Sequence, residues 1–175
     1  DLEAWTQRFL DAGAVQLGPM RLDARGSVVT LRMAQQEVLA LSSRGDGPSP
    51  AVRWHELHTT DVERALSTYA QLLSLVSTGT LALQDYAGRY ETFAFTGSAR
   101  SHGGMLETAR APHIHTHWLY YFAVEDLAGA LAAVRKLGGT VIAGPVAVPG
   151  GDLIAQCEDA QGAAFALRES KSTKD

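Results

Sequence analysis

The sequence predicts an α+β fold assembled from one repeated unit, and three observations support this prediction. When the chain is compared with itself at an offset of 65 residues, the run 61–66 falls on the run 126–131, with Asp, Ala and Leu matched. At an offset of 126 residues, Gly13 falls on Gly139. Hydrophobic periods change in the same order in each copy, from strand-like to helical and back. Similarity at a fixed offset is typical of a supersecondary unit that is used several times.

The hydrophobic pattern of each unit predicts a strand, an amphipathic helix and three further strands. Such a unit cannot bury its apolar face alone, so we expect two units to share one core. A ligand is expected at the seam between them, because small-molecule sites are concave and mostly apolar. The 175 residues are enough for one ordinary domain with a sizeable core, or for one domain and a fragment.

The first copy, residues 1–41, is incomplete. Leu2, Trp5 and Phe9 have helical spacing over residues 2–12, and Gly13 is a typical helix stop. Three short strands are predicted after it, over residues 15–17, 28–33 and 38–41. Residues 42–51 are dense in Gly, Pro and Ser and lack periodicity, which predicts a linker.

The second copy covers residues 52–109. It opens with an alternating strand over residues 52–59, and Thr60 and Glu63 have the spacing of a capping box. A helix is therefore predicted from Thr60 to about Ser74, with one apolar stripe. Strands are predicted near residues 76–83, 90–95 and 103–107.

The third copy covers residues 113–168 and repeats the same pattern. A strand is predicted over residues 117–124 and a helix from Asp126 to Leu137, closed by Gly138-Gly139. Three strands follow, near residues 141–143, 153–157 and 163–168. The second and third copies together predict one domain over residues 52–168, and the polar tail 169–175 is expected to fray.

Composition excludes several classes of protein. The formal net charge is -4 and no basic cluster occurs, which argues against a nucleic-acid partner. No apolar run approaches the roughly 20 residues that span a bilayer, so no membrane partner is expected. The single Cys157 excludes an intrachain disulfide and is typical of a reducing cytoplasm.

The alignment of the first copy leads to an expectation about assembly. At the offset of 126, Asp1 falls on Leu127, just after the first strand of a unit, so we expect further sequence upstream. A helix with three strands would leave an unpaired edge. The segment 1–41 is therefore expected to pack against the 52–168 domain or to pair with another copy of the chain. The apolar side chains Trp5, Phe9 and Val28–Leu31 favour a homodimer.

Short motifs occur in the order of a known superfamily: Trp54-x-Glu56-Leu57-x-Thr59-x-Asp61, Gly103-Gly104-Met105, Trp118-x-x-Tyr121-Phe122-x-Val124-x-Asp126, Leu137-Gly138-Gly139 and Asp159-x-Gln161-Gly162-Ala163-x-Phe165. Together they resemble the vicinal oxygen chelate superfamily, which includes glyoxalase I, bleomycin-resistance proteins and extradiol dioxygenases. Glyoxalase-like proteins with two such domains in tandem are the most similar in pattern. The resemblance implies paired β-α-β-β-β modules that form a curled mixed sheet around a cup, with the helices outside.

The resemblance also implies where metal ligands would lie. Metal-dependent members place four ligands in the cup, and the matching positions here are Trp54, Met105, Leu119 and Ala166. None of these is a His, Glu, Asp or Gln, and divalent metals need imidazole or carboxylate donors. We therefore expect no catalytic metal in the cup and no cofactor.

Strand alternation predicts which side chains line the cup. If Trp54 faces it, Glu56 and His58 do so too, and if Leu119 faces it, so does Tyr121. The predicted ligand-binding residues are accordingly Trp54, Glu56, His58, Met105, Leu119 and Tyr121. Glu56 and His58 are the candidate catalytic residues, because a carboxylate in an apolar site is poised as an acid or base. A structural Glu–His pair is the alternative.

A second group of histidines has two interpretations. On a strand, His113, His115 and His117 would share one face and three imidazoles can bind zinc. Pro112 and the spacing of the units instead place His113 and His115 in a connection between modules. His102, beside Gly103, is equally ambiguous.

Three classes of function remain open from the sequence. The first is a small-molecule binding protein, or a metal-independent enzyme, that uses the cup around Trp54, Glu56, His58 and Tyr121. The second is a metal-dependent lyase or dioxygenase with displaced ligands from Glu56, His58 or the histidine tract. The third is a non-catalytic interaction domain whose cup has degenerated.

Overall fold

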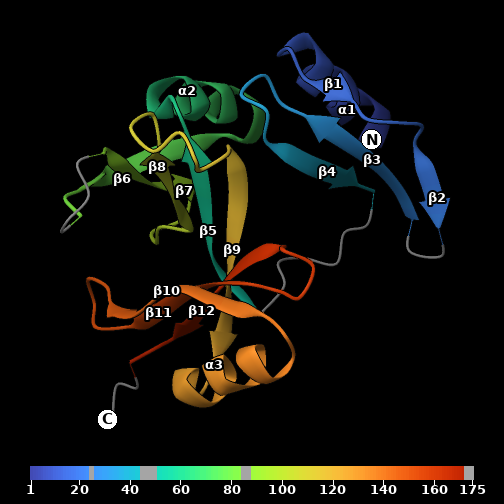
Figure 1. The fold of residues 1–175 in the computed structure, drawn as a ribbon. Coiled ribbons are helices and arrows are strands. Elements are labelled where there is room, and N and C mark those ends of the chain that lie inside the picture. The colour runs from blue at the N-terminus through green and yellow to red at the C-terminus, as the bar shows by residue number, and fades with distance from the viewer. Residues whose placement is uncertain (24–25, 44–50, 84–87, 172–175) are drawn as a thin grey trace. The chain divides into compact units, whose positions relative to one another are not determined.

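The computed structural model describes residues 1–23, 26–43, 51–83 and 88–171, and these form three helices and twelve strands (Figure 1). The chain divides into two compact units, and each is described by itself. Unit 1 consists of Asp1–Gly47 and Glu56–Trp118, and unit 2 consists of Pro48–His55 and Leu119–Asp175. The division passes within the strands Val52–Thr59 and His117–Val124, so each of these strands contributes residues to both units.

The first complete module has the predicted order of a strand, a helix and three strands. Its strands are hydrogen-bonded in the order β5-β8-β7-β6, and α2 packs against β6, β7 and β8. Three of the four strands have the bounds expected from their alternating pattern. The elements are β5 (Val52–Thr59), α2 (Val62–Leu73), β6 (Leu75–Leu81), β7 (Tyr90–Phe95) and β8 (Gly103–Glu107).

The helix α2 forms because one stripe of its side chains is apolar, but its first turn differs from the prediction. Val62, Ala65, Tyr69 and Leu72 are buried along that stripe. The N-cap is Asp61 and not Thr60, since the Asp61 carboxylate accepts a hydrogen bond from the backbone N–H of Arg64 at 2.9 Å. The capping-box prediction was therefore wrong by one residue, because a carboxylate at the next position caps the same turn.

The second complete module repeats this arrangement, which confirms the repeat seen in the sequence. Its strands follow the order β10-β11-β12-β9, so the first strand of each module lies next to the fourth, then the third and the second. Its β9 pairs in parallel with β12, and Ala166 lies opposite Tyr121. The elements are β9 (His117–Val124), α3 (Leu127–Lys136), β10 (Thr140–Ala147), β11 (Leu153–Glu158) and β12 (Ala164–Glu169).

The N-terminal segment forms a small sheet of its own in unit 1. Its elements are α1 (Leu2–Asp11), β1 (Val15–Gln16), β2 (Arg21–Asp23), β3 (Gly26–Arg32) and β4 (Val38–Ser42). Adding the offset of 126 to the bounds of β4 gives 164–168, which lies within β12. The strand β2 was not predicted, because its three residues carry no alternating pattern and it exists only by pairing with the start of β3.

This segment packs onto the first module within unit 1. Phe9, Val29 and Leu31 lie in the same hydrophobic core as Leu57 and Tyr69. Packing against the chain's own domain, which was one of the two expectations, is therefore observed within unit 1. The expected exposure of Phe9, Val29 and Leu31 was wrong, since all three are fully buried, whereas Trp5 is 39% exposed as expected.

Polar contacts hold the same junction. The hydroxyl of Tyr69 on α2 donates to Glu37 Oε1 at 2.9 Å and accepts from Trp118 Nε1 at 3.3 Å. Arg8 on α1 donates to the backbone carbonyl of Gln71 at 3.2 Å. The segment is therefore attached by hydrogen bonds as well as by apolar burial.

Two predicted connections fall partly outside the described residues. Of the predicted linker 42–51, Ser42 belongs to β4, and residues 44–50 lie outside the described part of the chain. Of the predicted tail 169–175, residues 172–175 also lie outside it. Glu169 is the last residue of β12, and its side chain accepts a hydrogen bond from the N–H of Leu127 at 2.6 Å. Within the described ranges, the helices are too short and too polar to cross a membrane.

Candidate functional site

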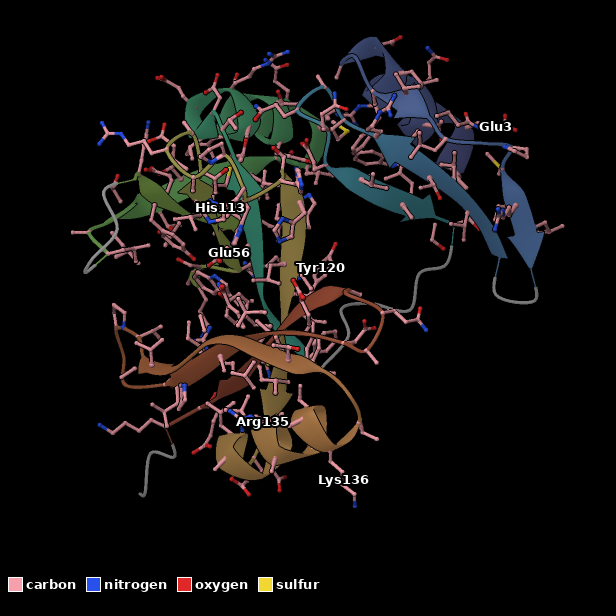
Figure 2. The ribbon with its side chains drawn as sticks, viewed as in Figure 1. Glu3, Glu56, His113, Tyr120, Arg135 and Lys136 are labelled. Atoms are coloured by element: carbon pink, nitrogen blue, oxygen red, sulfur yellow. The ribbon has the colours of Figure 1, made fainter. Side chains whose placement is uncertain are left out.

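The two candidate catalytic residues lie together on β5 in unit 1. Glu56 and His58 are two residues apart on the strand, so their side chains share one face, and Leu57 between them enters the core beneath α2. Each of the two is 5 % exposed. With the carboxylate as the acceptor, His58 Nε2 donates to Glu56 Oε1 at 2.8 Å. The structure therefore brings the predicted pair into direct contact (Glu56 is labelled in Figure 2).

Tyr90 on β7 completes this polar group. Its hydroxyl donates to Glu56 Oε2 at 2.7 Å, so both oxygens of Glu56 are engaged. The ring lies directly over Gly104 on β8, where a Cβ atom would come within 2.4 Å of Tyr90. No motif in the sequence singled out Tyr90. Gly104 is the signal that could have found it, because a glycine in a strand interior often marks the close approach of another group.

His117 is the next neighbour of the pair. Its ring centroid lies 4.6 Å from that of His58, and the rings are tilted by 58°. His117 Nδ1 donates to the backbone carbonyl of His115 at 2.7 Å, which fixes the orientation of the ring. Burial lowers the pKa of His117 below the usual 6.5; the bond to His115 opposes this shift and nearby His58 adds to it.

One nitrogen of the pair has no hydrogen-bond partner. His58 Nδ1 is buried, and no described residue donates to it or accepts from it. An unsatisfied buried polar atom costs about 1–3 kcal/mol, so it calls for an explanation. We name Glu56, His58, Tyr90 and His117 the acid–base group.

The rest of the histidine tract does not join this group. His113 and His115 are exposed and lie in the connection between β8 and β9, as the second interpretation predicted (His113 is labelled in Figure 2). His102 packs edge-on against Phe95 at 5.2 Å. Among the residues that the structure describes, no three His, Cys, Asp or Glu side chains are grouped as a metal site would require.

Met105 lies away from the acid–base group. It is fully buried in the core cluster that contains Leu57 and Phe93. In the register of β7 and β8, Met105 pairs with Glu91, while Gly104 and Leu106 lie on the face of Tyr90. Side chains alternate between the two faces of a strand, so Met105, which lies between Gly104 and Leu106, points to the face opposite Tyr90.

Unit 2 holds the other predicted binding residues. Leu119, Tyr121 and Ala166 are buried together, and Trp54 and Ile154 pack against them. The opposite side of these strands is covered by α3, where a separate core contains Leu127, Leu131 and Leu167. The predicted residues Trp54, Leu119 and Tyr121 therefore share the helix-free face of unit 2.

This face also carries Arg168 and Asp152, two charged residues that no motif in the sequence indicated. The Arg168 guanidinium carbon lies 5.4 Å from the centre of the Trp54 ring, and its Nε donates to Asp152 Oδ2 at 2.8 Å. Burial alone would raise the pKa of Asp152, but the N–H of Lys171 and the Arg168 guanidinium lower it overall. The repeat pattern does not identify Arg168 as a site residue. Its partner Asp152 lies close to it only because β11 pairs with β12.

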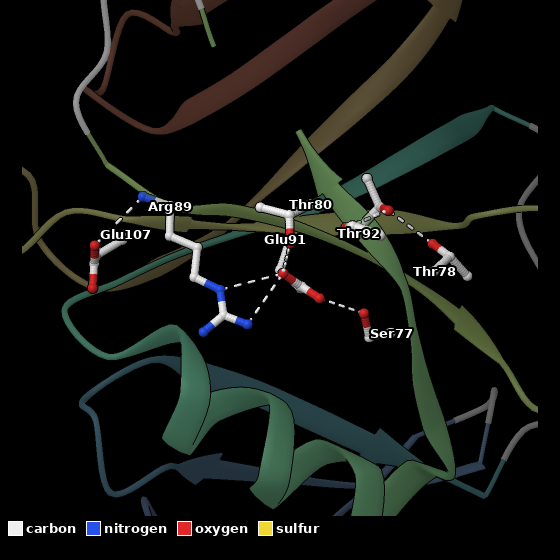
Figure 3. Close-up of polar contacts among 8 residues, drawn as sticks. Ser77, Thr78, Thr80, Arg89, Glu91, Thr92 and Glu107 are labelled. Atoms are coloured by element: carbon white, nitrogen blue, oxygen red, sulfur yellow. Dashed lines mark hydrogen bonds and ion pairs between the residues drawn. The ribbon is translucent and has the colours of Figure 1, made fainter. Parts of the chain in front are cut away.

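A buried carboxylate on β7 offers a useful contrast (Figure 3). Glu91 is 5 % exposed and accepts hydrogen bonds from Ser77, from Thr80 at 2.7 Å and from Arg89 at 3.2 Å. Burial alone would raise its pKa, but these hydrogen bonds and the charge of Arg89 together lower it. Each oxygen has a partner, so Glu91 has the contacts of a structural carboxylate that joins β6 to β7.

A surface depression of about 400 Å³ also lies in unit 2, on the α3 side. Apolar side chains of α3 and β12 dominate its lining, and Asp159 is its titratable member. The Asp159 carboxylate accepts from the N–H groups of Gln161 and Ala163, and these bonds lower its pKa. Asp159 thus shapes a turn, and the depression shares no residue with the acid–base group or the helix-free face.

The residues at the four inferred ligand positions do not fit a divalent metal. The indole of Trp54 offers an N–H donor and no lone pair, and Leu119 and Ala166 offer only hydrocarbon. Met105 offers a thioether, which suits Cu(I) and not Zn, Mn or Fe. The neighbours of Met105 on β8, Gly104 and Leu106, also lack donor side chains.

Comparison with known proteins agrees with the resemblance. The family model for the Glyoxalase/Bleomycin resistance protein/Dioxygenase superfamily matches residues 32–167. Two curated relatives, both named "Putative glyoxylase CFP32", come from Mycobacterium bovis and Mycobacterium tuberculosis. Each is 30% identical over 145 residues, which is 83% of this chain and 52% of the relative. The chain thus spans about half the length of these relatives.

Solved structures show the same fold. A methylmalonyl-CoA epimerase from Mycobacterium tuberculosis has a TM-score of 0.53 at 15% identity and covers 73% of this chain and 95% of its own. The Streptomyces coelicolor epimerase in complex with 2-nitronate-propionyl-CoA has a TM-score of 0.53 at 14% identity, with 70% and 98% covered. A hypothetical protein from Bacillus halodurans has a TM-score of 0.54 at 17% identity, with 71% and 96% covered.

The contact between Gly104 and Tyr90 predicts a specific coupling. We expect Gly104→Ala to destabilise the protein by about 1–3 kcal/mol, because the new methyl group collides with the Tyr90 ring. In a Tyr90→Ala background the same substitution should cost much less, since the ring is gone. Urea unfolding of the four proteins measures the coupling. An equal cost in both backgrounds would contradict it.

The lowered pKa of His117 predicts a pH dependence of stability. Because the folded pKa lies below the unfolded value of 6.5, the unfolded state binds the proton more readily. The stability that comes from keeping His117 neutral is therefore fully present above pH 6.5. It is lost as the pH falls from 6.5 towards the pKa of His117 in the folded protein. We expect His117→Gln to reduce the loss of unfolding free energy between about pH 7.5 and pH 5.5. Substitution of exposed His113 by Gln is the control, and an unchanged slope for His117→Gln would refute the prediction.

Proposed function

Because the chain belongs to the Glyoxalase/Bleomycin resistance protein/Dioxygenase superfamily, we propose that it binds a small organic molecule and moves a proton on it without a metal ion. The observation that carries the proposal is the unpartnered Nδ1 of His58. Its other ring nitrogen is bound to a carboxylate, and the carboxylate is held by Tyr90. In a general base of this kind, one ring nitrogen is held by a carboxylate and the other is free to take a proton.

The hydrogen bonds support a distinct role for each residue of the group. The Tyr90 hydroxyl donates to Glu56, so the carboxylate acts as an acceptor at both oxygens. His58 Nε2 then carries the hydrogen that faces Glu56, and in the neutral imidazole Nδ1 carries the lone pair. His58 is accordingly the base in this proposal, and Glu56 and Tyr90 position it.

The proposed step is a simple proton transfer. A C–H bond of the ligand breaks, its proton goes to His58 Nδ1, and the electron pair stays on the ligand. The imidazolium that forms is stabilised by the adjacent Glu56 carboxylate, at 2.8 Å from Nε2. Reversal of the step returns the proton, so the group can exchange ligand hydrogen with solvent.

Two observations support metal independence. The inferred ligand positions, Trp54, Met105, Leu119 and Ala166, offer no nitrogen or oxygen lone pair to a metal. Glu56 and His58 also bind each other. Two alternatives remain: a metal-dependent lyase or dioxygenase with displaced ligands, and a non-catalytic interaction domain. Measurement of proton exchange with and without a chelator distinguishes both from the proposed function.

We propose the helix-free face of unit 2, taken by itself, as a second surface that binds a small organic molecule. The partly buried Trp54 packs there against the buried Leu119 and Tyr121, and Gln156 Nε2 donates to the Tyr121 hydroxyl at 3.3 Å. A mostly apolar surface with a few placed polar groups is typical of small-molecule sites. We propose these residues as ligand contacts and leave Met105 to the core.

The test first identifies a ligand and then measures the exchange of its C–H hydrogen with solvent. A metabolite library that includes acyl-CoA thioesters is screened for ligands that raise the melting temperature, since a ligand at 100 times its Kd stabilises by about 2.7 kcal/mol. Exchange of ligand C–H hydrogen in deuterium oxide is then followed by NMR. We expect His58→Gln to slow exchange by about a hundredfold or more, the range of general-base catalysis.

The controls separate the alternatives. His113→Gln, which removes an exposed imidazole, should leave the exchange rate unchanged, and so should treatment with a chelator. Loss of exchange on chelation would favour the metal-dependent alternative. Ligand binding without any exchange would favour a binding protein, and full activity of His58→Gln would rule out His58 as the base.

We also propose that the chain forms a homodimer through β4. Among the described residues, β4 pairs with β3 alone, so its other edge is open. Val38 on this strand is 48% exposed. An open edge with exposed apolar side chains favours pairing with another strand.

Light scattering tests this proposal. We expect a mass of twice 18.7 kDa at micromolar concentration. Ala40→Lys, which places a charge on the open edge, should yield the monomer, whereas Thr30→Lys on the inner strand β3 should remain dimeric. A monomeric wild-type chain, or a dimer unaffected by Ala40→Lys, would contradict the proposal.

A further inference from the structure

Arg168 is a charged side chain on an otherwise largely apolar face of unit 2. Its side chain is 24% exposed, and the register places it on the same face as Ile154, its partner on β11. Ala166, two residues before it on β12, belongs to the apolar cluster with Leu119 and Tyr121. An arginine among such neighbours needs partners for its charge and for its hydrogen atoms.

The hydrogen bonds of Arg168 leave one edge of the guanidinium open. A guanidinium has five N–H donors, and here the Nε–H is bound to Asp152 Oδ2 at 2.8 Å. No other described residue accepts a hydrogen bond from Arg168. The four N–H groups of the two terminal nitrogens are therefore available to a ligand.

Asp152 holds the arginine in place and does not occupy that edge. Its Oδ1 accepts from the N–H of Lys171 at 2.9 Å, and its Oδ2 accepts from Arg168 Nε. The two contacts anchor the carboxylate, and the carboxylate orients the guanidinium plane. A pre-oriented arginine loses less side-chain freedom when it binds a ligand.

Trp54 places an aromatic ring beside this edge. The guanidinium carbon lies 5.4 Å from the ring centre, and Trp54 also contacts the cluster of Leu119, Tyr121 and Ala166. The face thus combines a planar donor edge with a flat apolar platform. Carboxylates match the two parallel N–H groups of arginine, and a flat ligand body matches the indole.

We infer that this face of unit 2 recognises a small organic carboxylate with a flat apolar body, which Arg168 binds through its terminal nitrogens and Trp54 through its ring. The inference rests on the proposed binding of a small organic molecule at the helix-free face, and it adds the chemical class of that molecule. It does not depend on the proton transfer proposed for His58.

Benzoate and benzamide provide a matched pair of probes, because they share the ring and differ in charge. The full chain labelled with ¹⁵N is titrated with each, and the Trp54 indole N–H signal, assigned with Trp54→Phe, is followed by NMR. We expect benzoate to bind at least about tenfold more tightly than benzamide, the contribution of a charge-assisted hydrogen bond. Arg168→Gln should abolish the preference.

Two further variants control the experiment. Arg135→Gln removes the same charge from the exposed surface of α3 in unit 2, and it should keep the full preference (Arg135 is labelled in Figure 2). Arg168→Lys keeps a charge beside Asp152 and so protects the fold if Arg168→Gln unfolds. It should lose most of the preference, because lysine lacks the planar pair of donors.

The outcomes separate this inference from the proposed function. Equal affinities for benzoate and benzamide would overturn the carboxylate inference and leave binding at the face intact. No response of the Trp54 signal to either probe would overturn both. Full preference in Arg168→Gln or loss of preference in Arg135→Gln would show that Arg168 is not the recognising group.

Discussion

The alternation of side chains along β5 is the constraint on which the rest of unit 1 depends. Leu57 enters the core beneath α2, so Glu56 and His58 are forced onto the opposite face of the same strand. Apolar burial at one residue thereby fixes where two ionisable side chains lie. It also sets their separation, because residues two apart on a strand meet on one face, and their contact at 2.8 Å follows. The Glu56–His58 pair is therefore positioned by the packing of the core.

Glu56 and Glu91 are two buried carboxylates that differ in their hydrogen-bond partners. Both carboxylates are 5 % exposed and both accept several hydrogen bonds. Around Glu91 the donors are hydroxyl groups and Arg89, so its negative charge is matched locally. The partners of Glu56 are Tyr90 and His58, and the far nitrogen of His58 is left without a partner. A buried polar atom without a partner costs free energy on folding, and the function proposed for His58 would give its free nitrogen a ligand to contact.

The N-terminal segment shows how a small helix and sheet are stabilised by a neighbouring module. Its own helix and sheet are too small to bury their apolar residues, so Phe9 and Leu31 join the core of the neighbouring module. The buried Glu37 then meets Tyr69, which also receives the indole N–H of Trp118. These contacts connect the segment to α2 and β9, and they make it part of unit 1.

Local patterns in the sequence predict the repeat, the superfamily, the approximate bounds of most strands and the meeting of Glu56 with His58. All of these depend on local spacing, since period-two alternation and helical stripes are written in consecutive residues. Tertiary structure decided the features that depend on strand pairing. Tyr90 reaches Glu56 across the sheet, Met105 lies on the core face because of its register with β7, and Arg168 meets Trp54 from a distant strand. Register between distant strands is set by packing of the whole sheet, and no local pattern encodes it.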